Sequence, residues 1–159
     1  MTRLRGRGRR GQRVHDYAPH GHWHTTTMIA SIRIDGTTSC LVVDGSTTAD
    51  VFREYVRQVL CPTLRPGDIV VADNLSAHKD RESEALIHAQ GATLAFLPPY
   101  SPDFNPIENM WSKVKSYLRT AKARTEDTLF TAIGEALERI TSKDAEGYFF
   151  LCGYTTSQS

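Results

Sequence analysis

Residues 70–115 constrain the fold more than any other stretch of the chain. An apolar run, IVVA, ends at Asp73 and predicts a strand that carries this carboxylate at its C-terminal end. Asn105 and Pro106 then predict the start of a helix, which places Glu108 on its first turn. A helix facing the mouth of a sheet can bring two such carboxylates together, and hard oxygen ligands suit Mg²⁺. The stretch therefore predicts a divalent metal site at Asp73 and Glu108.

A structural role for Glu108 stays open beside this one. A Glu at the third position of a helix is also half of a capping box, in which its side chain bonds the backbone at the helix start. Capping alone would account for the residue. From these residues alone both interpretations stay open.

Hydrophobic periodicity predicts an α/β fold. An antiparallel hairpin turning at Gly36 precedes an alternation of strands and helices, and this order is typical of a mixed sheet flanked by helices. The strand that precedes Asp73 is almost wholly apolar, so we expect it to be covered on both faces. The expected strands are 25–34, 39–43, 69–72 and 93–97, and the expected helices are 48–61, 80–90, 106–118, 126–140 and a short one that Ser142 caps. Thr47 or Thr48 is expected to cap the first helix, and its apolar face is expected to comprise Val51, Phe52, Tyr55, Val56, Val59 and Leu60. In the helix 126–140 the residues expected to face inward are Leu129, Phe130, Ile133, Leu137 and Ile140.

Composition limits the class of protein. The 159 residues, 40% of them apolar, suffice for one domain with its own core. No run of 18 apolar residues exists, so we expect no membrane partner. Three widely spaced cysteines form no metal motif and indicate reduced, buried thiols in a cytosolic protein.

The charge is unevenly distributed. The net charge is +1, but residues 1–13 hold six arginines and no acid, whereas the remainder has 13 basic and 18 acidic residues. Arginine offers bidentate contacts to phosphate, so this arm predicts a DNA-contacting segment. A solvated, disordered tail is the alternative. The six residues are Arg3, Arg5, Arg7, Arg9, Arg10 and Arg13.

Four histidines between residues 15 and 24 raise the question of a transition-metal site. Since no Cys or carboxylate completes a tetrahedral set, we do not predict one. Asp16 and Asp44 are likewise not expected to serve in catalysis, because the first lies in this irregular segment and the second precedes a glycine turn.

The segments DNLSAHK and LPPYSPDFNPIEN and the 34-residue interval resemble the DDE transposases of the Tc/mariner superfamily, in particular its bacterial insertion-sequence branch. RGRGRRGQR, PHGHWHTTT and LRPGDIVVADN fit the same branch, so the resemblance runs from about Thr2 to Tyr154. It implies a ribonuclease H-like fold, Mg²⁺ or Mn²⁺, and cleavage and transfer of DNA strands in transposition. It also implies transposon ends and target DNA as partners, a homodimer in the full-length protein, and action at the bacterial nucleoid in the cytoplasm.

The resemblance extends to further site residues. Asp73 and Glu108 match two members of the catalytic acidic triad. The loop after Asp73 places His78 and Lys79 at the rim of the site, while Asn74 and Asn105 are expected to shape it. On the helix of Glu108, the outward-facing cations Lys113 and Lys115 are expected to contact the DNA backbone.

One departure from the family pattern affects activity. In the family the first catalytic Asp lies on a first strand upstream of RGRGRRGQR, and this chain begins two residues before Arg3. We therefore expect the sheet to lack its first strand, the strand edges to be exposed, and catalysis by the chain alone to be weak or absent. The alternatives are an inactive transposase fragment that binds DNA or dimerises, and another ribonuclease H-like nuclease. The expected organisation is a basic, His-rich lead-in over 1–24, the domain over 25–154 and a tail over 155–159.

Overall fold

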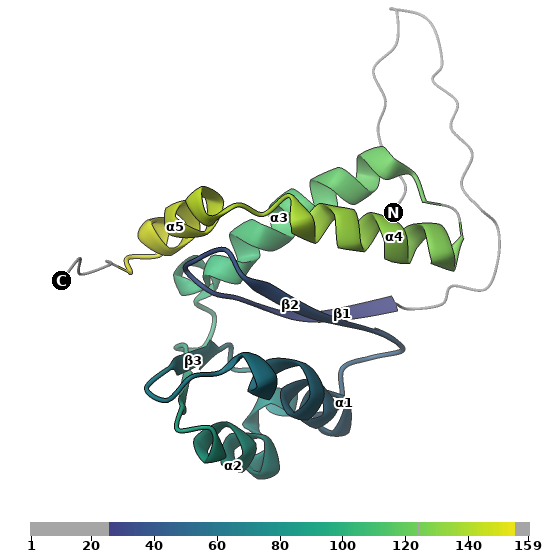
Figure 1. Cartoon of the computed structure of the whole chain (residues 1–159). Helices are drawn as coiled ribbons and strands as arrows, with labels where there is room; N and C mark the ends of the chain where they lie inside the picture. Colours follow the sequence, from purple (N-terminus) through teal and green to yellow (C-terminus); the bar gives the residue numbers. More distant parts are fainter. Residues whose placement is uncertain (1–25, 124, 155–159) are drawn as a thin grey trace, which may run out of the picture.

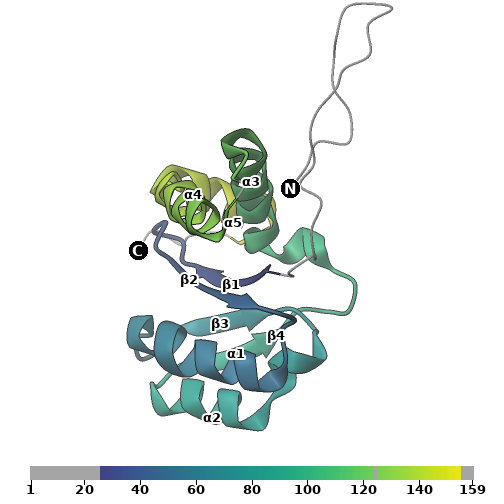
Figure 2. The same ribbon diagram turned by 90° about the vertical axis from the view of Figure 1, so that its right-hand side faces the viewer.

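The computed structural model describes residues 26–123 and 125–154 (Figures 1 and 2). These residues form five α-helices and four strands, with short 3₁₀ and π turns between some of them, and this mixed α/β architecture confirms the predicted fold class. The elements are β1 (Thr26–Ile32), β2 (Thr38–Asp44), α1 (Ala49–Tyr55), η1 (Val56–Leu60), η2 (Cys61–Thr63), β3 (Ile69–Ala72), η3 (Ser76–Lys79), α2 (Arg81–Ala89), β4 (Thr93–Phe96), η4 (Pro102–Phe104), α3 (Pro106–Ala121), α4 (Glu126–Glu138) and α5 (Ser142–Leu151).

The hairpin β1–β2 forms as predicted. The strands pair antiparallel from Thr26 opposite Asp44 to Ile32 opposite Thr38. Gly36 takes a φ of +88° in the turn, a conformation that L side chains rarely adopt, and the Asp35 carboxylate accepts a hydrogen bond from the Thr37 N–H at 2.8 Å. Glycine and an Asx turn thus set the register of the strands.

The helix after the hairpin begins at the predicted cap but changes pitch before it ends. The Thr48 hydroxyl accepts a hydrogen bond from the Val51 N–H at the start of α1. The segment then widens into a π turn and narrows into a 3₁₀ turn that contains Pro62, which has no N–H to continue the helix. Of its predicted apolar face, Val51 and Val59 are partly buried, and the buried residues are Phe52, Tyr55, Val56 and Leu60.

Two hydrophobic cores lie on opposite faces of the hairpin (Figure 2). On one face Ile29 and Leu41 pack with α1, η1 and α2, and Val70 and Leu94 of the second sheet join this core. On the other face Met28 packs with α3 and α4 through buried residues such as Val114. The domain therefore has a helical layer on each side of β1 and β2.

The second sheet is covered on one face only by the described residues. β3 and β4 pair parallel, with Ile69 opposite Thr93, and α2 connects them. Val70 points into the core, but Ile69 is 69% exposed and Val71 is 39% exposed. The expectation that this strand is covered on both faces is wrong for the described residues, because α3 and α4 pack on the hairpin instead.

The two sheets are separate within residues 26–123 and 125–154. β1 pairs only with β2, and β3 only with β4, so one edge of β1 and one edge of β3 carry no strand partner in this part of the chain. A bidentate ion pair joins them instead: the Arg33 guanidinium, just after β1, donates to both oxygens of Asp68, just before β3, at 2.7 and 2.8 Å. The end of β1 therefore lies beside the start of β3.

The C-terminal helices require two corrections. Thr141, not Ser142, caps α5, in a capping box with Asp144 that satisfies both backbone N–H groups. Phe130 was expected to face inward, but it is 46% exposed because Ile133 and Ala136 form the buried stripe of α4.

The expectation of buried thiols holds for two of the three cysteines. All three cysteines are free thiols, and Cys61 and Cys152 are buried. In residues 26–123 and 125–154, no helix has the length and apolar content needed to cross a membrane.

Candidate metal centre

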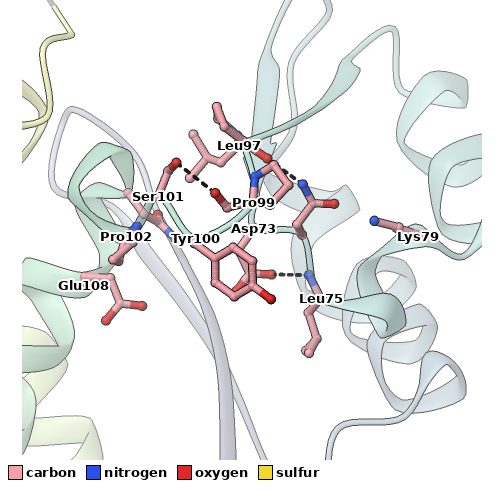
Figure 3. A pocket seen from close by; sticks show the side chains of 12 residues that line it. Asp73, Leu75, Lys79, Leu97, Pro99, Tyr100, Ser101, Pro102 and Glu108 are labelled. Carbon is pink, nitrogen blue, oxygen red and sulfur yellow. Dashed lines mark hydrogen bonds between the residues drawn. The ribbon is translucent and has the colours of Figure 1, made fainter.

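A pocket of about 460 Å³ lies where the ends of β3 and β4 meet the start of α3 (Figure 3). Asp73 lines it from the end of β3 and Glu108 from the first turn of α3. Figure 3 shows Glu108 on one side, Lys79 on the opposite side and Asp73 between them. The pocket is lined by Asp73, Asn74, Leu75, Lys79, Leu97, Pro98, Pro99, Tyr100, Ser101, Pro102, Asn105 and Glu108.

One oxygen of Asp73 is held by its own loop. The Leu75 N–H donates to Asp73 Oδ1 at 3.0 Å, and His78 Nδ1 lies 2.6 Å from the same oxygen. The His78 approach is oblique to the ring N–H and does not make a well-formed hydrogen bond, so it is a close polar contact. Both contacts fall on Oδ1, so among the described residues Oδ2 has no hydrogen-bond partner and remains available to a ligand.

Packing fixes the position of His78. Its ring lies against the ring of Phe52 in α1, with centroids 4.4 Å apart and a 39° tilt, and its side chain is only 17% exposed. The 3₁₀ turn η3 that carries His78 is continuous with Asp80, which caps α2 through the Ser83 N–H. These contacts give the Asp73 loop a rigid base.

The Asp80 cap is also tied to α1. Arg53 donates from Nε and Nη2 to the two carboxylate oxygens of Asp80, at 2.9 and 2.8 Å. This guanidinium, aided by hydrogen bonds from Ser83, holds the pKa of Asp80 well below its usual range. The ion pair joins α1 to the start of α2 directly after the loop that borders the pocket.

Asn74 connects the two strand ends. Its side-chain amide donates to the Leu97 carbonyl at 2.8 Å, just after β4. This bond anchors the start of the proline-rich arm of residues 98–102 beside Asp73. The predicted role of Asn74 in shaping the site remains a prediction, and this contact is its structural basis.

The first turn of α3 leaves Glu108 free to face the pocket. Asn105 occupies the N-cap position and Pro106 the first helical position, as predicted, but the Asn105 side chain makes no capping bond. Helices α4 and α5 have capping boxes, whereas α3 has none. Within the described residues no hydrogen-bond donor contacts the Glu108 carboxylate, so capping does not account for this residue.

Of the eight predicted site residues that the structure describes, six lie at the pocket or contact Asp73, and Lys113 and Lys115 do not. Lys79 lines the pocket, whereas Lys113 donates to the Asp144 carboxylate at 2.7 Å and to the Arg139 carbonyl at 2.8 Å, and so ties α3 to the start of α5. Lys115, half-buried on α3, does not line the pocket. The six arginines of the basic arm and the four histidines near it lie outside the described residues.

Two carboxylates, those of Asp73 and Glu108, line the pocket. In residues 26–123 and 125–154, no group of three or more His, Cys, Asp or Glu side chains is placed to hold a metal ion. Sequence reasoning missed Tyr100, whose ring borders the pocket. Its position in a proline-rich arm between the two carboxylates was the available signal.

Comparison with known proteins supplies the family. No curated protein matches the chain. A family model described as DDE superfamily endonuclease matches residues 1–130, which is most of the chain and includes Asp73 and Glu108. The chain therefore belongs to the DDE superfamily endonucleases, a family of nuclease and transposase-type enzymes that act on DNA and generally use divalent metal ions.

Proposed function

We propose that this chain is the catalytic domain of a transposase of the Tc/mariner type, from its bacterial insertion-sequence branch. The proposed reaction is cleavage of DNA strands and their transfer to a target. The observation that carries the proposal is that Asp73 and Glu108 line one pocket although they lie on separate elements.

The donor set of the pocket fits a hard divalent cation. Asp73 offers Oδ2, Glu108 offers its whole carboxylate, and Mg²⁺ or Mn²⁺ is commonly bound by one or two carboxylates together with water and phosphate oxygens. When bound, such an ion lowers the pKa of an attacking water and neutralises charge that develops on the phosphate. Asp73 and Glu108 would hold it at the pocket.

The remaining residues of the pocket would position the substrate. The contacts from the Leu75 N–H and from His78 both fall on Oδ1 of Asp73, so Oδ2 has no partner among the described residues. Lys79 lies on the wall opposite Glu108 (Figure 3), where its ammonium can bind a phosphate of the DNA backbone. The basic arm of residues 1–13 would supply further backbone contacts.

A third carboxylate is expected beside Asp73. In the described residues one edge of β1 and one edge of β3 carry no strand partner, and we propose that a further strand, parallel to β3, pairs there with its C-terminal end at the pocket. We propose that the family's first Asp enters the site on such a strand, from a segment outside the described residues or from another polypeptide. Without this third carboxylate, catalysis is expected to be weak.

A supercoiled plasmid and an oligonucleotide with a free 3′-hydroxyl test this proposal. With Mn²⁺, nicking and end joining should occur slowly with the parent chain and fall at least tenfold in Asp73→Asn and in Glu108→Gln. Glu84→Gln, which neutralises an exposed carboxylate on α2, is the matched control and should behave as the parent does. Nicking that persists in both site variants would contradict the proposal, and nicking without joining would favour another ribonuclease H-like nuclease.

A non-catalytic, DNA-binding or dimerising fragment is the second candidate. It is favoured by the incomplete ligand set and the unpaired strand edges within the described residues. Binding of DNA without any metal-dependent nicking would support this function over the first.

A further inference from the structure

Tyr100 has a backbone conformation that its side chain disfavours. It takes a φ of +56° in the turn that follows Pro99, at a position where Gly or Asn is usual. The left-handed conformation costs an L residue roughly a factor of ten in the folding equilibrium. In the described part of the chain one other non-glycine residue, Lys122, has a positive φ, and it ends α3, where such a residue is common.

Packing of the Tyr100 side chain does not offset this cost. Tyr100 is fully exposed, with a relative surface of 103%, and it belongs to neither hydrophobic core. The ring is therefore exposed to water although the backbone that carries it has a strained conformation. Strain of this kind that persists without a packing gain indicates a binding role.

The arm that carries Tyr100 is held at both ends. At its start the Asn74 amide donates to the Leu97 carbonyl at 2.8 Å, and beyond it the Tyr154 hydroxyl donates to the Phe104 carbonyl at 3.0 Å. Three prolines between these points restrict the backbone further. The arm thus presents the ring in a fixed place and limits the entropy lost on binding.

The surroundings of the ring select its ligand. In the view of Figure 3 the ring is projected over Asp73, between Glu108 on one side and Lys79 on the other. The two carboxylates disfavour an acidic peptide, whereas a nucleotide can place its base on the ring and its phosphate near Lys79. Every base has a π-face that can stack on tyrosine.

We propose that Tyr100 is a stacking platform for an unpaired nucleobase of the DNA bound at this pocket, an inference that rests on the proposed function. A base inside a duplex is stacked on both faces, so it must leave the stack to lie on the ring. The residue therefore binds DNA at single-stranded or locally opened positions beside the two carboxylates.

Quenching of 2-aminopurine fluorescence tests the inference without a metal ion. The full chain would be titrated, in EDTA and about 150 mM salt, with a single-stranded oligonucleotide that carries 2-aminopurine and with the same strand in a duplex. Moderate salt weakens the contribution of the arginine arm. The parent should quench the single strand more than the duplex, and Tyr100→Ala should lose the quenching and bind the single strand roughly five- to 150-fold more weakly.

Three further variants separate stacking by the ring from a role of the hydroxyl and from a role in folding. Tyr100→Phe should keep the quenching, because the ring and not the hydroxyl stacks. Tyr100→Gly should lose the quenching yet unfold at a temperature equal to or above that of the parent, because glycine relieves the backbone strain. Phe150→Ala, which removes a ring that is 73% exposed on α5 away from the pocket, is the matched control and should not change binding.

The outcomes distinguish this inference from the proposed function. DNA binding and quenching that survive in Tyr100→Ala would overturn the stacking role and leave the proposed function standing. Failure of the parent chain to bind any DNA would overturn both. Concentration-dependent self-association that Tyr100→Ala abolishes, with DNA binding unchanged, would assign the ring to a second copy of the chain and reject the nucleobase.

Discussion

The ion pair between Arg33 and Asp68 tests how the two sheets are held together. No backbone hydrogen bond joins β1 to β3 in the described residues, so this bidentate contact is the link between the end of one strand and the start of the other. Asp68→Asn keeps the size of the side chain and an acceptor for the Arg65 N–H but removes the charge. We expect the variant to be less stable at neutral pH.

The pKa of Asp68 sets the magnitude. The Arg33 guanidinium, with a further hydrogen bond from the Arg65 backbone, lowers the pKa of Asp68 from 3.8 to about 2. A shift of this size corresponds to about 2.4 kcal/mol at neutral pH, which we reduce to about 1–2 kcal/mol because solvent screens a partly exposed pair. Since the folded-state pKa is depressed, the stabilisation is complete above pH 4 and is lost as the pH falls towards 2.

Urea unfolding of the parent and the variant at several pH values measures this effect. With a denaturant dependence of about 2 kcal/mol per molar urea, the midpoint of Asp68→Asn should fall by about 0.5–1 M at pH 7. The difference should be roughly halved at pH 3. Asp44→Asn, on the exposed end of β2, is the matched control and should stay within about 0.5 kcal/mol of the parent. A midpoint for Asp68→Asn equal to that of the parent at pH 7, or a deficit that does not shrink at pH 3, would refute the reasoning.

Three more predictions concern single positions. Gly36→Ala should lower the melting temperature more than Gly45→Ala, because both have positive φ but only the Gly36 Cβ would meet backbone, at 2.8 Å from the Ser142 nitrogen; equal losses in calorimetry would count against this. Burial raises the pKa of the Cys40 thiol to about 11, so iodoacetamide at pH 8 should label it about 100-fold more slowly in the folded than in the unfolded chain, and equal rates by mass spectrometry would contradict the burial. Ile69→Thr should change the unfolding free energy by less than about 0.5 kcal/mol and reduce aggregation in light scattering, since its side chain is exposed; a large loss of stability would show that β3 is covered.

Local sequence signals predicted the elements around the pocket well. The cap at Thr48, the turn at Gly36 and the prolines before α3 act through adjacent backbone, so they can be read without the fold. For the same reason the end of β3 and the first turn of α3 were placed correctly, and with them Asp73 and Glu108.

Features that depend on tertiary contacts could not be predicted from the local sequence. The apolar run of β3 predicts burial on both faces. Whether its second face is covered depends on where α3 and α4 pack, and these helices pack on the hairpin. Lys113 also depends on a tertiary contact. Helical periodicity predicts a cation on the surface, but its ammonium donates to the Asp144 carboxylate at the start of α5. The positive φ of Tyr100 could not be predicted from the local sequence, because glycine, and not tyrosine, is the residue that indicates such a conformation.

Binding of Mn²⁺ tests the central claim, that Asp73 and Glu108 form one divalent metal site, most directly. Calorimetric titration of the parent chain should show saturable binding, and Asp73→Ala and Glu108→Ala should each weaken it at least tenfold. Glu84→Gln should bind as the parent does. Binding that survives in both alanine variants, or a parent chain that binds no Mn²⁺, would contradict the metal site that the geometry of the pocket supports.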